Sequence, residues 1–466
     1  MFIGSIAFIL FFLTTHHFTS EDQCEKYEAL FSFIILFYII GFSALLPLLL
    51  PFGVDQMEGA SEQSLKSYFA WFFGVLNAGA FVSYSYYLGF TDVRDISLYQ
   101  IDKDNNPNVV IILLAGLLLG TVSLFIAILL YKFLVNTKRL SVYQPSGDPL
   151  GLIWNVTKSA MNKYSQKRRR PSITRSIQYL EGSQRLLDLA KDDHGNNTFE
   201  NVESVKTFYR IMPLLLALIP YFAVTSVSTG AYIEQNIYLF DQFEDSTIIP
   251  QLVDPCIIII LVFLFEFNPV KKRLKFSSIL QRVYIGVFFG LASLIFATIV
   301  EFVSTFAAPF KLSYGALQAF KNLTHPDDPG QKVKVLLFKI SFQSPQFLLM
   351  GISEFLAVIG IFEFIYAQSP REMKCFIYGL FQCIRGIGYI IPFIVNEILQ
   401  AATCACSNCN CKTCAAYHYQ CNGAPTNVSY TYLAGTLLFT LYVISLYFLF
   451  RRYKKRVRQP REIWYT

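Results

Sequence analysis

The chain has 466 residues, of which 54% are hydrophobic and only 15% are charged, and its mean hydropathy is +0.42. These values exclude an ordinary soluble domain, in which about a quarter of the residues are charged. The 45 Phe and 28 Tyr residues suit lipid-facing helices and the aromatic belts at the two bilayer interfaces. The formal net charge of +7 does not indicate a nucleic-acid binder, because the Lys and Arg residues lie between apolar runs and in one tail. The composition therefore predicts a polytopic membrane protein.

Several apolar runs along the chain are long enough to cross the hydrocarbon core of a bilayer. Each has roughly 17–25 residues, the length of a helix that spans about 30 Å. They begin near Ala29, Tyr68, Val109, Met212, Ile249, Val283, Gln346, Phe376 and Tyr430. A shorter run from Phe2 to Leu13 is either a further span or the core of a signal peptide, and we favour a span because no Lys or Arg precedes it. The sequence thus predicts about ten transmembrane helices.

Positive charge is distributed unequally among the segments that join these runs. With Met1 in the cytosol, the segments on the inside carry most of the Lys and Arg, as the positive-inside rule requires. We interpret their basic clusters as signals for orientation and as contacts to anionic lipid. The inside segments are Pro51–Ser67, Leu134–Arg210, Asn268–Arg282, Ala367–Lys374 and the tail after Phe450.

The long polar segment from Lys138 to Val205 divides the predicted helices into two groups. We predict a partial N-terminal bundle of four spans at 1–137, a cytoplasmic linker at 138–205, a six-helix C-terminal bundle at 206–450 and a basic cytoplasmic tail at 451–466. The C-terminal bundle includes a Cys-rich lumenal loop at 399–429. A six-plus-six transporter without its first two helices would have this asymmetry. Helical periodicity alone does not distinguish it from an unrelated fold with ten spans.

Motifs inside the runs are more specific than the runs themselves. Gly41–Gln56 combines a glycine start, two prolines and the ending Phe-Gly-Val-Asp-Gln, and Tyr68–Phe81 is an aromatic run followed by Asn-Ala-Gly. Pro345–Pro370 contains two glutamates and ends in Tyr-Ala-Gln-Ser-Pro. In order and spacing these segments resemble the proton-coupled oligopeptide transporter family, nearest its peptide/histidine transporter branch. Shorter matching segments are Asp148–Ala160, Val205–Pro213 and Gln281–Gly286.

The resemblance implies an all-α bundle of the major facilitator type, with about ten transmembrane helices here and the first two of twelve missing. The implied function is proton-coupled transport of di- and tripeptides, with histidine as a further candidate, by rocking of two halves around a midplane site. The implied location is the endolysosomal or plasma membrane. Protons are the coupling ion and no other cofactor is implied. The implied partners are the bilayer and small peptides, without nucleic acid.

Two features depart from the family pattern. The helix that carries the family's E-x-x-E-R motif is absent, because the chain begins about where the third helix would, and Leu46 replaces the fourth-helix Lys. Both departures concern proton coupling and the peptide carboxylate, so we expect little proton-driven accumulation by this chain. The alternative is a transport-inactive family member, or an incomplete gene product, with an interaction or regulatory role. A membrane enzyme is disfavoured, because the spans contain no Ser/His/Asp, metal-ligand or phosphate-cradling arrangement.

Ionisable residues inside the predicted spans are candidates for substrate and proton binding, because a charge at the bilayer centre costs at least about 2.5 kcal/mol. Glu354 lies about eight residues into its run and matches the family's Glu that binds the substrate amine and the proton. Arg385 should reach a similar depth on the next helix, where it pairs with Glu354, binds a substrate carboxylate or simply packs. Glu363 lies about half a turn around the helix from Glu354, which favours a structural role.

Polar residues in other helices complete the candidate site by resemblance. Asn77 either hydrogen-bonds a peptide or joins helices. Asp254 stands where the peptide branch usually has Asn, and Ser226 stands where the family has an acidic residue or Gln. Tyr221 is a further lining candidate, although aromatic residues are weak evidence in this chain. The family-motif residues to which we give a structural role are Gly53, Asp55, Gln56, Glu363, Tyr366 and Pro370.

The predicted lumenal loop contains closely spaced cysteines. We predict disulfides, because the loop lies outside and its two C-x-x-C units are too crowded for a standard zinc site. A metal site or an untypical insertion are the alternatives. The sequons at Asn322 and Asn427 predict N-glycosylation on the same side. The cysteines are Cys404, Cys406, Cys409, Cys411, Cys414 and Cys421.

Overall fold

The computed structural model consists of α-helices and short 3-10 turns, and it contains no strand within the residues that it describes. Helical backbone at 47–55 precedes the first bounded helix. The elements are α3 (Glu62–Phe90), α4 (Pro107–Asn136), α5 (Pro149–Arg169), η2 (Leu186–Ala190), α7 (Phe199–Leu216), α8 (Ile219–Thr229), α10 (Ile249–Glu266), α12 (Ile279–Phe306), α14 (Ser344–Gln368), η4 (Arg371–Met373), α15 (Lys374–Thr403) and α17 (Thr426–Arg456). The described residues are 36, 39–41, 43, 45, 47–57, 59–90, 107–141, 147–169, 186–191, 197–230, 232, 249–266, 278–306, 343–403 and 426–456.

The predicted apolar runs correspond to these helices. Every run from Tyr68 onwards falls on a helix, whereas the run near Ala29 lies partly, and Phe2–Leu13 wholly, outside the described residues. In the described part, five helices are long and apolar enough to cross a membrane, or six if the bent pair α7 and α8 is one span. Helices α3 and α10 do not meet that criterion, yet they pack in the same bundle. The chain is a multi-pass helical membrane protein.

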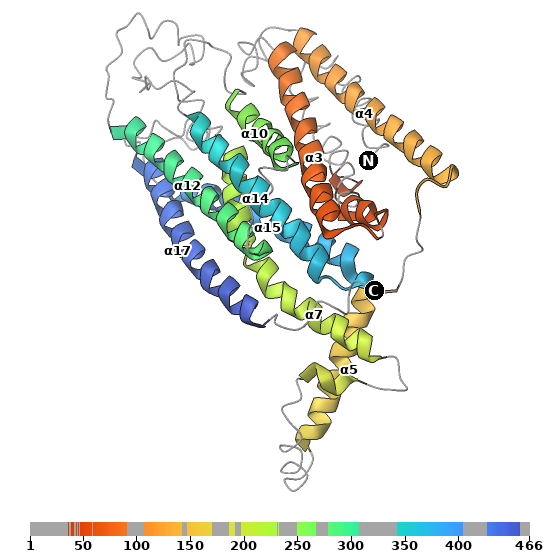
Figure 1. Cartoon of the computed structure of the whole chain (residues 1–466). Coiled ribbons are helices and arrows are strands. Elements are labelled where there is room, and N and C mark those ends of the chain that lie inside the picture. Colours follow the sequence, from red (N-terminus) through yellow and green to blue (C-terminus); the bar gives the residue numbers. More distant parts are fainter. Residues whose placement is uncertain are drawn as a thin grey trace, which may run out of the picture.

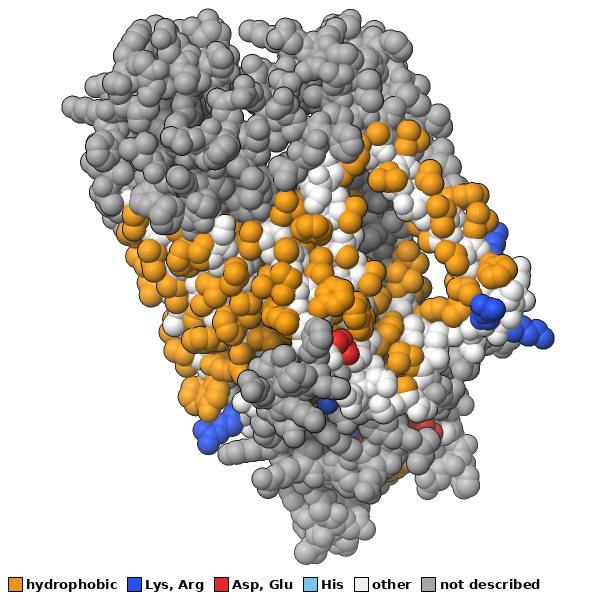
Figure 2. All heavy atoms as spheres, turned by 45° about the horizontal axis from the view of Figure 1, so that its top comes forward, with side chains coloured by type: hydrophobic (Ala, Val, Ile, Leu, Met, Phe, Trp, Pro, Cys, Tyr) orange, Lys and Arg blue, Asp and Glu red, His pale blue; other side chains and the backbone are white. Residues whose placement is uncertain are grey.

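The bundle is built from neighbouring helices that run alongside one another (Figure 1). Helix α12 packs against α14 and α17, while α10 packs against both α3 and α14. Helix α15 packs against α8, and α5 projects from the bundle. Figure 2 shows that hydrophobic side chains cover much of the visible flank, with Lys and Arg near its edges. Large exposed apolar residues on α4, α15 and α17 suit contact with lipid.

Small residues allow α12 and α14 to pack closely. A Cβ added at Gly286 would lie 2.5 Å from the backbone nitrogen of Ala357 and 2.9 Å from the carbonyl oxygen of Ser353. One turn further along, a Cβ at Gly290 would lie 3.1 Å from Ser353 Oγ. Glycines four residues apart that face small residues let two membrane helices approach at backbone distance. This seam fixes the position of α14, the helix that carries Glu354.

We expect Gly286→Val to destabilise the bundle, because the side chain would collide with the backbone of α14. Overpacking of a close contact costs about 1–3 kcal/mol. The measurement is thermal unfolding of the purified protein in detergent. Gly435→Val on α17 is the matched control, because a Cβ there meets nothing within 4 Å. Equal unfolding temperatures for the two variants would contradict the close packing.

The run near Met212 forms a broken span. Helix α7 contains Pro213, and α8 has Pro220 at its start; the two helices are bent by 41°. Proline removes a backbone donor and clashes with the preceding turn, which accounts for the break. Helix α7 begins at Phe199, where Thr198 caps it by accepting a 3.3 Å hydrogen bond from the backbone of Asn201. The last part of the predicted linker is therefore the start of this helix.

A charge cluster holds the linker turn η2 against α7. Lys206, whose side chain is only 8% exposed, contacts Asp188 and lies 2.7 Å from Glu203. Lys191 lies 2.9 Å from Asp188 and 3.4 Å from Glu203. Partial burial raises the pKa of Asp188, but hydrogen bonds from Lys206 and Lys191 outweigh it, so this pKa lies below its usual range. The pKa of Glu203 is lowered for the same reasons.

We expect this cluster to release η2 in acid. A carboxyl whose pKa is depressed by folding stabilises the folded state above its unfolded pKa of about 4, and this contribution is lost as the pH falls through the folded pKa. The mobility of a nitroxide label at the exposed Leu186 should therefore increase below about pH 4. Asp188→Asn is the control and should make the label mobile at neutral pH as well. A label equally immobile at neutral pH in Asp188→Asn would contradict this role of the cluster.

Candidate functional site

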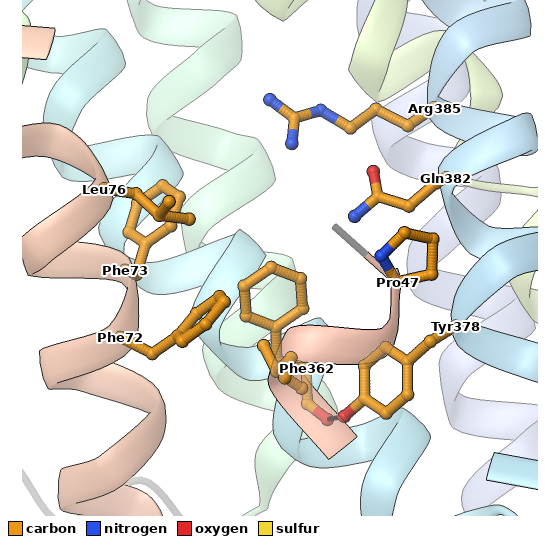
Figure 3. A pocket seen from close by; sticks show the side chains of 9 residues that line it. Pro47, Phe72, Phe73, Leu76, Phe362, Tyr378, Gln382 and Arg385 are labelled. Carbon is orange, nitrogen blue, oxygen red and sulfur yellow. Dashed lines mark hydrogen bonds between the residues drawn. The ribbon is translucent and has the colours of Figure 1, made fainter. Parts of the chain in front are cut away.

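A cavity lies between helices from the two sides of the linker (Figure 3). It encloses about 330 Å³ of space, part of which is open. Its walls come from the segment before α3, from α3 itself, from α14 and from α15. The lining residues are Pro47, Leu50, Phe72, Phe73, Leu76, Phe362, Tyr378, Gln382 and Arg385.

One end of the cavity is aromatic. The ring of Phe362 on α14 contacts Phe72 and Phe73 on α3 at centroid distances of 6.4 and 6.3 Å. Tyr378 on α15 packs on Phe362 and donates a 2.7 Å hydrogen bond to its carbonyl oxygen. These residues join α3, α14 and α15 across the cavity (Figure 3). The aromatic end therefore offers an apolar surface and no free charge.

The other end of the cavity holds the guanidinium of Arg385. Figure 3 shows this side chain extending from α15 into the open space, beside Gln382. Its Nε and Nη2 donate to Tyr389 Oη at 3.0 and 2.7 Å. Two of its three nitrogens are thus held in place, and Nη1 makes no hydrogen bond to the described residues. A fixed guanidinium with an open donor edge is suited to a carboxylate.

Two carboxylates face the same region from neighbouring helices. Glu354 on α14 interacts electrostatically with Arg385, and Asp254 on α10 interacts with Glu354. No ion pair or hydrogen bond joins either carboxylate to another described residue. The carboxylates of Glu354 and Asp254 both interact electrostatically with two tyrosine hydroxyls, those of Tyr84 on α3 and Tyr221 on α8. The structure therefore gathers three of the residues predicted from sequence, Glu354, Arg385 and Asp254, around one place.

The other predicted pocket residues are engaged within the protein. Asn77 donates a 2.9 Å hydrogen bond to the carbonyl of Phe73 on its own helix. Ser226 donates a 3.0 Å hydrogen bond to the carbonyl of Tyr389, which joins α8 to α15. Tyr221 is fully buried and lies 3.3 Å from Ser353 Oγ. Tyr221 and Ser226 thus support the helices that carry Glu354 and Arg385.

The motif residues before α3 lie at the linker end of the bundle. Gln56 donates a 2.9 Å hydrogen bond to the carbonyl of Ser141 and accepts a 2.8 Å bond from its backbone nitrogen. Asp55 interacts electrostatically with Tyr68 and with Cys375. Gly53 lies against Tyr68, so that a Cβ there would collide with the ring. The motif therefore ties the segment before α3 to the ends of α4 and α15.

The motif residues of α14 are likewise in structural contacts. Glu363 forms a 2.8 Å ion pair with Arg282 of α12. Tyr366 packs on Phe69 of α3, and the Lys374 ammonium lies 3.9 Å from the centroid of the Tyr366 ring. Pro370 is the N-cap residue of η4. The six cysteines, Asn322 and Leu46 lie outside the described residues, as does the side chain of Asn427 in the first turn of α17.

Sequence reasoning missed most of the cavity lining. Three of the lining residues are not among the site residues predicted from sequence: Phe362, Tyr378 and Gln382. Yet Tyr378 and Gln382 lie seven and three residues before Arg385 and so share its helical face. That spacing was the available signal for the residues of α15. Phe362 carried no such signal, because Phe residues are spread throughout α14.

The fold and this site define a polytopic transporter-type helical bundle with charged groups of both signs facing one internal region. The sequence matches the profile of the POT family over residues 1–411, and the chain belongs to that family. Its fold is that of solved POT proteins. The crystal structure of an auto-inhibited POT family peptide transporter has a TM-score of 0.57 and 14% identity, with 99% of this chain and 83% of that chain covered. The in meso structure of PepTSo has the same TM-score and 15% identity, with 97% and 83% covered.

Curated relatives are similar over most of this chain. Solute carrier family 15 member 3 of Rattus norvegicus is 27% identical over 381 residues, which cover 77% of this chain and 60% of the relative. Protein NRT1/PTR FAMILY 7.3 of Arabidopsis thaliana is 25% identical over 419 residues, which cover 80% of this chain and 62% of the relative. The chain thus spans about 60% of the length of the relatives that it matches.

Proposed function

We propose that this chain mediates proton-coupled transport of di- and tripeptides, with histidine as a further candidate substrate, across an endolysosomal or plasma membrane. Membership of the POT family and the fold of solved POT peptide transporters support the proposal. The observation that carries it is the electrostatic interaction of Glu354 on α14 with Arg385 on α15, whose guanidinium lines the cavity.

Charge complementarity explains why this arrangement suits a peptide. A short peptide is a zwitterion, so that its ammonium group fits a carboxylate and its carboxylate fits a guanidinium. Glu354 supplies the first partner and Arg385 the second, while the aromatic end of the cavity offers an apolar surface for a side chain. Alternating access would follow from rocking of α3 and its neighbours against α14 and α15, which meet around the cavity.

The test is uptake of a radiolabelled dipeptide, alanyl-alanine, into proteoliposomes that contain the full chain. We expect uptake to exceed that of protein-free liposomes and to increase when the outside is made acidic, but only by a small margin, because Leu46 stands where the family has its fourth-helix Lys. Unlabelled dipeptide should compete, whereas a blocked dipeptide without free amine and carboxylate should not. Binding of alanyl-alanine without any uptake would favour the transport-inactive alternative, for which the replacement of the family's Lys by Leu46 is the supporting observation.

A further inference from the structure

We propose that Asp254 and Glu354 form a carboxylate pair that shares one proton, so that Asp254 is a second proton-holding group of the transport site. This inference rests on the proposed function for its role in coupling, but the pair itself is a property of the described helices. It begins with the contact between α10 and α14. There Gly351 has no side chain, and a Cβ added to it would lie 2.9 Å from Asp254 Oδ1 and 3.0 Å from the Asp254 carbonyl oxygen.

Because Gly351 has no side chain, Asp254 packs directly against the backbone of α14. Gly351 and Glu354 are three residues apart, so they lie on the same face of that helix. The Asp254 carboxylate is thus placed one turn from Glu354, and the two charges act on each other. Asp254 Oδ1 is buried and has no hydrogen-bond partner. A buried carboxylate oxygen without a donor is costly, and a proton on the carboxyl removes that cost.

Only one described cation faces the pair. The groups that interact with the pair are Tyr84 on α3, Tyr221 on α8 and the guanidinium of Arg385 on α15. Tyrosine hydroxyls are neutral near pH 7. One guanidinium compensates one carboxylate, and the second carboxylate keeps an uncompensated charge in a low-dielectric region unless it binds a proton. Two carboxylates that share a site behave in this way.

The pair explains how a proton and a peptide can occupy the site together. With Glu354 alone, the Glu354–Arg385 pair is already neutral, and a zwitterionic peptide keeps it neutral. An added proton would then leave net positive charge. With Asp254 present, one proton makes the empty site neutral, and the peptide adds one charge of each sign without displacing that proton. Simultaneous occupancy is what symport requires, whereas a single carboxylate forces the proton and the ammonium group to compete.

The test is infrared spectroscopy of the purified full chain at neutral pH, where the C=O stretch of a protonated carboxyl group is separate from that of a carboxylate. We expect a protonated-carboxyl band in the unsubstituted chain that is lost in Asp254→Asn and restored in Asp254→Glu. Asp148→Asn is the matched control, because Asp148 is exposed at the start of α5, and it should keep the band. An unchanged band in Asp254→Asn, or its absence from the unsubstituted chain, would overturn the proposal.

A second measurement separates this inference from the proposed function. In proteoliposomes with an entrapped pH indicator, the unsubstituted chain should move about one proton with each alanyl-alanine, and Asp254→Asn should still move the dipeptide with the proton flux lost. A proton-to-peptide ratio unchanged in Asp254→Asn counts against the pair. If no dipeptide binds or moves while the infrared band behaves as expected, the proposed function is wrong and the proton-sharing pair stands.

Discussion

Glu354→Gln is expected to reduce pH-gradient-driven uptake of alanyl-alanine by about ten-fold or more. The substitution keeps the shape of the side chain but removes its charge and its ability to exchange a proton. Coupling requires that proton and peptide bias the same conformational states, and Glu354 interacts with both Arg385 and Asp254. Initial uptake rates with and without an acidic exterior provide the measurement. The same loss should appear in a Leu46→Lys background, where we expect the starting uptake to be higher.

Glu200→Gln is the matched control for this experiment. Glu200 is exposed in the first turn of α7, outside the bundle, and its replacement should leave uptake unchanged. Counterflow exchange of labelled for unlabelled dipeptide, measured without a pH gradient, reports whether Glu354→Gln still binds substrate. Retention of full pH-driven uptake in Glu354→Gln would exclude this residue from proton coupling.

The largest loss of stability is expected from breaking the ion pair between Arg282 and Glu363. Both side chains are buried, with 8% and 5% exposed, and the pair joins α12 to α14 at 2.8 Å. Removing one partner of a buried pair costs about 3–5 kcal/mol, because the other charge is left uncompensated. Glu363→Gln should therefore lower the thermal unfolding temperature more than Gly286→Val does. Thermal unfolding in detergent, followed by intrinsic fluorescence, measures both.

A double variant distinguishes the loss of the attraction between Arg282 and Glu363 from the cost of leaving one buried charge unpaired. Apolar replacement of both partners of a buried ion pair is often neutral or stabilising. The combination Arg282→Met with Glu363→Met should therefore be more stable than Glu363→Gln alone. A double variant less stable than either single variant would indicate that the pair stabilises the protein by itself.

The helices were predictable because the length of an apolar run can be read directly from the local sequence. Each run from Tyr68 onwards lies on one helix or, for the run near Met212, on the bent pair α7 and α8. The motif Pro345–Pro370 lies almost wholly within α14. The start of α7 within the predicted linker was harder to foresee, because its Thr198 cap and polar first turn precede the apolar residues of the helix. A capping threonine followed by a polar first turn is less visible in hydropathy than a long apolar run.

Candidate site residues stand out in the sequence where their chemistry is unusual inside lipid, and not where it is common. Glu354, Asp254 and Arg385 stood out because charges are rare in apolar helices, and the structure brings them together. Gln382 and Phe362 did not stand out, because their place in the cavity depends on which helices meet. The sequence likewise gives no sign that the Asn77 amide donates to the carbonyl of Phe73 on the same helix. The partner of a polar side chain is a tertiary property.

The contact between α3 and α10 has an energetic consequence for any rocking motion. Ser67 donates a 2.7 Å hydrogen bond to Glu266, and the rings of Trp71 and Phe263 meet edge to face with centroids 5.2 Å apart. Helix α3 precedes the linker and α10 follows it, so separating the two halves breaks both contacts. A hydrogen bond to a charged group contributes about 1.5–3 kcal/mol and an aromatic pair about 0.5–1.5 kcal/mol. Together they bias the resting population toward the closed arrangement of these two helices, and a substrate must bind the opened arrangement more tightly by at least that much to invert it.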